Sequence, residues 1–441
     1  FYVRETFASL KYPAYRIWFF SALIANIGTW MQRIAQDWLV LRTLTNDSAY
    51  AVGVVSALQF GPSLLFSPHA GVVADRVNPR KLLVCTQGLM GLISALLAAD
   101  VISGQVQLWH VYVAAALTGV VAAYDAPVRQ TFVASMVPVG SLSNAVGLNA
   151  TSFNAARLIG PAFAGLVINW VGEGWVFGIN ALTFLMPMAA LILTPRRHFR
   201  EVERSKPKPG QLREGVAYLH SRSDILVIMV VIAVVSAMTL NFPVTLAAMV
   251  RSTFHMEADA YGNVSSAFAI GSLTGALVAA RRRDSRVRLV IIGALGLGVA
   301  TCILALMPNY YTFMAASIPV GFFVLSLLTA ANQSVQLTTP EAVRGRVMSL
   351  YVMVLLGATP IGSPVVGWLS DAFGPRAALM AGGISSMAAA VLVSLWAFKA
   401  WNIRLRYLRH APFVETVRAR QAQADNENGL ISPQDDQLKR C

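Results

Sequence analysis

Long apolar stretches separated by short loops fill the chain from about Ile17 to about Lys399. Each stretch is roughly 20 residues long, the length that a helix needs to cross about 30 Å of hydrocarbon. No water reaches the backbone inside a bilayer, so a crossing segment must satisfy its own hydrogen bonds as a helix. The sequence therefore predicts an all-α membrane protein with twelve transmembrane helices, at 17–43, 50–73, 82–101, 107–127, 143–170, 175–194, 225–249, 261–280, 288–306, 311–331, 346–369 and 377–399.

Composition leaves little room for a soluble enzyme domain. Charged residues make up 13% of the chain, against roughly 25% in an average soluble domain. The sequence contains no Cys-x-x-Cys pair, no His-rich or paired-carboxylate metal pattern, no G-x-S-x-G and no G-x-x-x-x-G-K-[ST] loop for ATP phosphates. We therefore expect no metal and no cofactor. We also expect a transporter rather than an enzyme, with an integral-membrane enzyme or a transport-dead sensor as the alternatives.

Lysine and arginine are concentrated on alternate loops, and loops rich in these residues stay in the cytoplasm. If twelve spans are counted, the basic segments share one side of the membrane, and the loops of the other side hold only Arg42, Arg251 and Arg376. Both termini are therefore predicted to be cytoplasmic. The net charge of +14 then faces anionic lipid headgroups, so membrane lipids are expected partners and nucleic acid is not.

A charged, proline-bearing segment divides the twelve predicted spans into two sets of six. Its second part has apolar residues at helical spacing, Leu212, Val216 and Leu219, which predicts a short amphipathic helix on the membrane surface. Apolar and basic residues alternate from Ile403 to Arg409, which predicts an interfacial segment, and the polar tail from about Gln421 is predicted to be disordered. The predicted regions are an N-terminal arm 1–16, a six-helix bundle 17–194, a linker 195–224, a second six-helix bundle 225–399 and a cytoplasmic tail 400–441.

The two bundles resemble each other weakly. Gly53 and Gly262 match at an offset of 209 residues, and the pair Gly160 and Gly165 matches Gly362 and Gly367 at an offset of 202. The fixed order of these matches predicts two pseudo-symmetric repeats related by an axis along the membrane normal. Transporters built in this way bind their substrate between the halves, near the middle of the membrane.

The loop between the second and third spans carries a recognisable signature. Residues 71–81, GVVADRVNPRK, resemble the G-x-x-x-D-R-x-G-R-[RK] signature of the major facilitator superfamily, with Pro79 in place of a glycine. The resemblance covers essentially the whole chain and implies that Asp75 caps a helix of the other half and pairs with a basic residue such as Arg129. The alternative is a charged loop that only sets topology. The matching signature residues are Gly71, Asp75, Arg76, Arg80 and Lys81.

The fifth span resembles the antiporter motif of drug:proton exporters of that superfamily, G-x8-G-x3-G-P-x2-G-G. Two glycines of the motif are replaced by alanine, and the matching residues are Gly147, Gly160, Pro161 and Gly165. The alternative is a generic face of small residues that lets helices pack closely. Residues 31–40, 125–130 and 154–161 are similar to the branch that contains the enterobactin exporter and macrolide or multidrug efflux pumps.

Several charges lie inside predicted spans, where each costs at least about 2.5–3.5 kcal/mol and indicates a function. Arg33 and Asp37 lie one helical turn apart on the first span, Arg157 lies near the middle of the fifth, and Asp125 lies near the cytoplasmic end of the fourth. In one interpretation Asp37 or Asp125 carries a proton, and an arginine competes for the carboxylate or holds an anionic substrate group. In the other, Arg33–Asp37 is a static pair and Asp125 caps or pairs at the rim. Polar neighbours expected to line the same region are Asn26, Gln36 and Asn154.

The resemblance implies a monomeric transporter of the bacterial inner membrane that exports an amphiphilic small molecule, a drug-like compound or a siderophore, in exchange for protons. The same fold also serves uptake and lipid flipping, and these remain the alternatives within transport.

Overall fold

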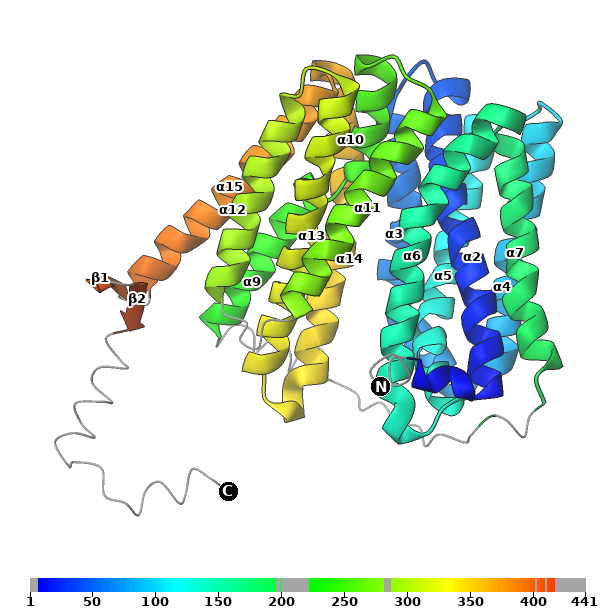
Figure 1. Ribbon diagram of the computed structural model, residues 1–441, viewed down its shortest axis with the longest axis horizontal. Coiled ribbons are helices and arrows are strands. Elements are labelled where there is room, and N and C mark those ends of the chain that lie inside the picture. Colours follow the sequence, from blue (N-terminus) through cyan, green and yellow to red (C-terminus); the bar gives the residue numbers. More distant parts are fainter. Residues whose placement is uncertain are drawn as a thin grey trace.

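The computed structural model describes residues 7–195, 199, 222–280, 287–400, 403–408 and 411–416. The predicted amphipathic helix around Val216 lies outside the described residues, as does the tail beyond residue 416. Figure 1 shows two groups of long helices side by side, the N-terminal group in blue to green and the C-terminal group in green to orange.

The N-terminal group consists of six long helices preceded by the short η1 (Ala8–Lys11). They are α2 (Pro13–Trp38), which continues as the π-helical η2 (Leu39–Leu44), α3 (Ala49–Arg76), α4 (Pro79–Ile102), α5 (Leu108–Phe132), α6 (Val139–Val171) and α7 (Glu173–Leu193). A one-turn 3-10 helix, η3 (Val133–Ser135), follows α5. Each long helix contains one of the six spans predicted from the sequence, within a few residues at each end.

The C-terminal group begins with an interrupted helix. It runs through α9 (Ser223–Val234), π-helical η5 (Val235–Thr239), α10 (Phe242–Ala248) and π-helical η6 (Met249–Thr253), where the sequence predicted one continuous helix. Pro243 lies in the first turn of α10, and its missing N–H fits the break in the helix at this point. The other helices are α11 (Ala258–Ala280), α12 (Val287–Ala305), α13 (Tyr310–Thr338), α14 (Glu341–Phe373) and α15 (Pro375–Ala400).

The all-helical membrane fold is confirmed. Among the described residues, eleven helical segments are long and apolar enough to cross a membrane. The first predicted span is not among them, because α2 carries Arg16, Asn26, Arg33 and Asp37 within its length. It nevertheless runs the full height of the N-terminal group beside the others (Figure 1). After α15, β1 (Ile403–Leu408) pairs antiparallel with β2 (Ala411–Thr416), so the alternating apolar and basic residues form a hairpin.

Four glycines of the internal repeat lie where the two groups cross. A methyl group added to Gly53 on α3 would lie 2.3 Å from the carbonyl oxygen of Ser363 on α14, and one added to Gly262 on α11 would lie 2.3 Å from that of Pro161 on α6. Gly367 and Gly165 approach the first turns of α3 and α11 in the same way. The crossings α3–α14 and α6–α11 are thus pseudo-symmetric, and each needs the missing side chain.

The approach of the two groups loosens along α3 and α14. Beyond Gly53, a methyl group on Gly61 would come no closer than 3.8 Å to Pro360, and one on Gly357 would meet only the side chain of Leu64. Further along, Gly71 on α3 and Gly345 on α14 would meet nothing within 4 Å. The groups therefore contact each other closely at one end of the molecule, which we call the closed end and which carries Asp47, Ser48, Arg251 and Asp371.

Candidate functional site

Asp37 joins the two groups of helices near the closed end. Its carboxylate is buried at the end of α2, and the Tyr261 hydroxyl of α11 donates a hydrogen bond to Asp37 Oδ2 over 3.0 Å. The Trp38 indole stacks on the Tyr261 ring, with 6.2 Å between ring centroids and 21° between planes. The Tyr261 hydroxyl also lies 3.2 Å from the carbonyl oxygen of Pro243, in the first turn of α10.

Arg33 does not form the static ion pair with Asp37 that one interpretation of the sequence required. Within the described residues its guanidinium makes no hydrogen bond and no ion pair, and its Nε is shielded from solvent without a partner. The guanidinium carbon lies 4.7 Å from the ring centroid of Trp30 and 5.3 Å from that of Phe60. Aromatic faces attract a cation in this geometry, so the rings stabilise a charge that Asp37 does not neutralise directly.

Arg157 on α6 lies over the same indole. Its guanidinium carbon is 5.5 Å from the centroid of Trp30 and 5.5 Å from that of Phe268, which belongs to the other group of helices. No carboxylate in the described part of the chain lies within ion-pair distance of it. The structure therefore brings the guanidinium groups of Arg33 and Arg157 together over Trp30, while Asp37, one turn beyond Arg33 on α2, contacts Tyr261.

The polar residues predicted around this site have different surroundings. The Asn154 side chain donates to the Ala150 carbonyl oxygen one turn earlier in α6. The Gln36 Nε2 is buried without a partner among the described residues. Asn26 is partly buried on α2. The sequence did not single out Gln32, which accepts hydrogen bonds from Ser94 and Asn180 in the interior of the N-terminal group.

The Asp125 carboxylate accepts hydrogen bonds from three side chains. It is buried and accepts hydrogen bonds from Thr86 Oγ1 at 2.6 Å and Gln87 Nε2 at 2.8 Å. The Arg129 guanidinium binds Asp125 Oδ2 through both Nε at 2.8 Å and an Nη at 2.7 Å. This arrangement ties α4 to α5 and matches the interpretation of Asp125 as a paired residue.

The signature residues 71–81 lie at the end of α3 and the start of α4. The side chain of Asp75 is outside the described part, so its predicted contact with the other half stays a prediction, while Arg129 is bound to Asp125. Arg80 donates to the carbonyl oxygens of Leu191 and Thr194, at 2.6 and 2.7 Å, and so caps the end of α7. Arg76 and Lys81 are exposed.

The antiporter-motif residues pack α6 on both sides. A methyl group on Gly160 would lie 2.7 Å from Trp30 Cβ, so this glycine lets α2 and its charged site approach α6. Pro161 and Gly165 form the crossing with α11 described above. A methyl group added to Gly147 would meet nothing in the described part of the chain within 4 Å. These contacts fit the interpretation as a small-residue packing face. Through Gly160 that face lies against Trp30 of the charged site.

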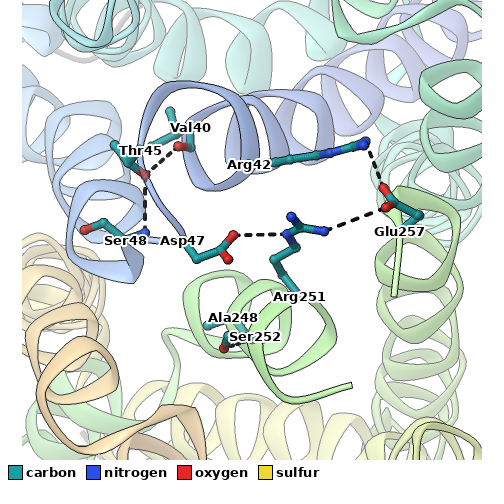
Figure 2. Close-up of polar contacts among 9 residues, drawn as sticks. All are labelled: Val40, Arg42, Thr45, Asp47, Ser48, Ala248, Arg251, Ser252 and Glu257. Carbon is teal, nitrogen blue, oxygen red and sulfur yellow. Dashed lines mark hydrogen bonds and ion pairs between the residues drawn. The ribbon is translucent and has the colours of Figure 1, made fainter. Parts of the chain in front are cut away.

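Charged side chains connect the two groups at the closed end, and sequence reasoning missed this set (Figure 2). Arg42 pairs with Glu257 at 2.8 Å, and Arg251 pairs with Asp47 at 3.0 Å and with Glu257 at 3.7 Å. The available signal was charge placement, because Arg42 and Arg251 stand on loops otherwise almost free of basic residues.

Asp371, near the end of α14, caps the start of α3 across the same boundary. Its carboxylate accepts hydrogen bonds from Ala49 N at 2.6 Å, Tyr50 N at 3.0 Å and Ser48 Oγ at 2.8 Å. The first N–H groups of a helix have no partner within the helix and attract negative charge. A residue of one group thus completes a helix of the other.

Comparisons with known proteins agree with this geometry. A family described as transmembrane secretion effector, of the major facilitator type, matches residues 4–429. Multidrug efflux pump Tap of Mycobacterium tuberculosis is 27% identical over 388 residues, covering 84% of this chain and 90% of Tap. Enterobactin exporter EntS of Escherichia coli is 23% identical over 417 residues, covering 91% and 94%.

The fold is also similar to solved transporter structures. A bacterial homolog of the human lysosomal transporter Spinster, solved in an inward-facing and unoccupied conformation, aligns with a TM-score of 0.64 at 14% identity, over 87% of this chain and 95% of that one. This likeness concerns the arrangement of the helices alone.

Proposed function

Since the chain belongs to the transmembrane secretion effector family of the major facilitator superfamily, we propose that it exports an amphiphilic small molecule, a drug-like compound or a siderophore, in exchange for protons. A multidrug efflux pump and an enterobactin exporter among its relatives support export. The observation that carries the proposal is the Tyr261–Asp37 hydrogen bond, because it sets a buried carboxylate across a boundary that must open during transport.

The difference between the two ends supports alternating access. Glycine crossings, ion pairs and the Asp371 cap hold the closed end, whereas at the other end a methyl group added to Gly71 or Gly345 would meet nothing in the described part of the chain within 4 Å. In the orientation predicted from the basic loops, the closed end faces away from the cytoplasm. The chain in this state takes up cargo from the cytoplasm, and rocking of the two groups then opens the closed end.

Asp37 is the proposed proton carrier. In the present state the carboxylate is buried at the boundary between the two groups and accepts a hydrogen bond from Tyr261. Opening of the closed end separates α2 from α11, so Asp37 loses this donor while it becomes accessible to water on the outer side, where it takes up a proton. When the closed end forms again, Tyr261 returns and the proton leaves toward the cytoplasm.

Proteoliposomes test this function. We would reconstitute the full chain, impose an acidic lumen without ATP, and follow three dyes: anionic 8-anilino-1-naphthalenesulfonate, neutral N-phenyl-1-naphthylamine and cationic ethidium. Molecules whose cytoplasmic face points outward should drive at least one dye into the vesicles. Asp37→Asn should stop this accumulation, and Glu173→Gln, which removes a carboxylate at the start of α7, should not. Movement of none of the dyes, or movement that requires ATP, contradicts the proposal.

A further inference from the structure

Two guanidinium groups share one aromatic ring in the middle of the protein. Arg33 and Arg157 both lie over Trp30, with guanidinium carbons 4.7 and 5.5 Å from its centroid. The two positive charges are therefore no more than about 10 Å apart, close enough to repel each other where water is scarce. They come from α2 and α6, which Gly160 allows to approach closely.

Nothing in the described residues neutralises this pair by direct contact. Asp37, the nearest carboxylate along α2, accepts its hydrogen bond from Tyr261 and has no ion pair with Arg33. Arg33 Nε is shielded from solvent and has no acceptor. Arg80, Arg129 and Arg251, by contrast, do have acceptors. Two cations without acceptors beside a boundary between moving halves are suited to an acceptor that arrives from outside.

Aromatic rings surround the pair. Phe60 of α3 lies against Arg33, Phe268 of α11 lies against Arg157, and Phe153 packs edge-on against Trp30 with 5.7 Å between centroids. We propose that Arg33 and Arg157 bind an anionic group of the cargo while these rings contact its apolar body, so that the exported molecule is an aromatic or amphiphilic organic anion. This inference rests on the proposed function and names its substrate class.

Guanidinium chemistry defines the group that is bound. Arginine presents a planar fork of donors that fits carboxylate, sulfonate and phosphate oxygens. Such oxygens occur both in a soluble cargo and in the headgroup of an anionic lipid, and the ligand proposed here is the soluble anion. The inside-negative potential of a cell also favours outward movement of an anion, so the membrane potential would assist the export of an anionic cargo.

Binding of two related dyes provides the test. 8-Anilino-1-naphthalenesulfonate and N-phenyl-1-naphthylamine share one aromatic body and differ by the sulfonate. In phosphatidylcholine nanodiscs, corrected for protein-free discs, the wild type should bind the sulfonate about ten-fold more tightly, since a charge-assisted hydrogen bond contributes about that factor. Arg33→Gln and Arg157→Gln should each lose this preference while binding of the neutral dye stays within about two-fold.

Controls separate charge from structure. Arg157→Lys keeps the charge and should retain part of the preference. Arg288→Gln makes the same chemical change at an exposed residue of α12 and should change nothing. A measurement on the wild type alone covers the case in which a variant fails to fold: naphthalene-1-sulfonate should displace the anionic dye about ten-fold better than naphthalene-1-sulfonamide.

Three results overturn the inference. They are equal affinity of the wild type for the two dyes, parallel loss of both dyes in a folded Gln variant, and loss of sulfonate binding by the wild type in phosphatidylglycerol discs, which would assign the site to lipid phosphate. Binding does not depend on transport. Sulfonate binding without dye movement in proteoliposomes would therefore reject the exporter and keep the anion site. Movement of only neutral or cationic dye would reject the anion site and keep the exporter.

Discussion

The carboxylate of Asp371 on α14 accepts a hydrogen bond of 2.6 Å from the backbone N–H of Ala49, the first residue of α3. One half of the protein thereby caps a helix of the other half. The closed end cannot open without exposing the unpaired N–H groups of that helix, so the cap stabilises the present state.

Asp371→Ala should therefore favour the state that is open at the closed end. Loss of a capping carboxylate costs about 0.5–2 kcal/mol, which shifts a two-state population by up to about thirty-fold. Spin labels at the exposed residues Trp109 of α5 and Tyr311 of α13, which lie in the first turns of helices that begin at the closed end, would report the distance between the halves. Asp371→Asn keeps an acceptor oxygen and should shift the population less. Identical distance distributions for all three proteins would show that the cap plays no part in the equilibrium.

The glycine crossings predict a strong effect of position on the same substitution. Gly53→Ala would place its methyl group 2.3 Å from a backbone oxygen of α14, whereas Gly345→Ala meets nothing within 4 Å. We expect Gly53→Ala to destabilise the protein by about 1–3 kcal/mol, because backbone cannot move aside as a side chain can. Gly345→Ala should be neutral or stabilising through helix propensity. Thermal unfolding in detergent measures both, and similar melting temperatures would contradict the close crossing.

The ion pairs of the closed end should contribute modestly and in a salt-dependent way. The side chains of Arg251 and Asp47 are 28% and 41% exposed, so their coupling should be about 0.2–1 kcal/mol. A double-mutant cycle with Arg251→Gln and Asp47→Asn would measure it from the same distance populations. The coupling should vanish at about 1 M salt, where the screening length falls to about 3 Å. A coupling that persists there would mean that the pair acts through packing.

Asp37→Asn should stop proton-driven transport without unfolding the protein. Arg33 makes no ion pair with Asp37, so the substitution does not strand a paired cation, and the amide oxygen that it introduces can still accept from Tyr261. Anionic dye should bind at least as tightly, because a negative charge near Arg33 is gone. We would measure dye binding, melting temperature and efflux for Asp37→Asn and for the double variant Arg33→Gln/Asp37→Asn to test this prediction. A double variant that is stable and pumps normally would remove both residues from the mechanism.

The helices were predictable because hydrophobic length is a local property of the sequence. The repeat of glycines also predicted a real feature, since Gly53 and Gly262, and likewise Gly165 and Gly367, form the crossings between the two groups. The interruption between α9 and α10 was not predicted, because the span was assigned from its apolar length alone and the signal of Pro243, which can end or kink a helix, was not used.

Partners of charged residues were harder to predict than their positions. The spacing of Arg33 and Asp37 suggested an ion pair, but Asp37 instead meets Tyr261, 224 residues away in the sequence. Asp371 and Ala49 are 322 residues apart. Such contacts depend on how the two halves are placed, which a local pattern does not contain. Asp125 and Arg129 lie at positions i and i+4 of one helix, a spacing that a local pattern does contain, but Arg129 was predicted to pair with Asp75 instead.

A reversible cross-link at the closed end tests alternating access most directly. Ser48 and Asp371, whose side-chain oxygens lie 2.8 Å apart, would be replaced by cysteine in a chain whose native cysteines are changed to serine. Residues this close can form a disulfide. Oxidation should stop transport of whichever dye the reduced protein moves, and reductant should restore it. Undiminished transport by the fully cross-linked protein would show that cargo crosses without opening of the closed end, which would contradict alternating access.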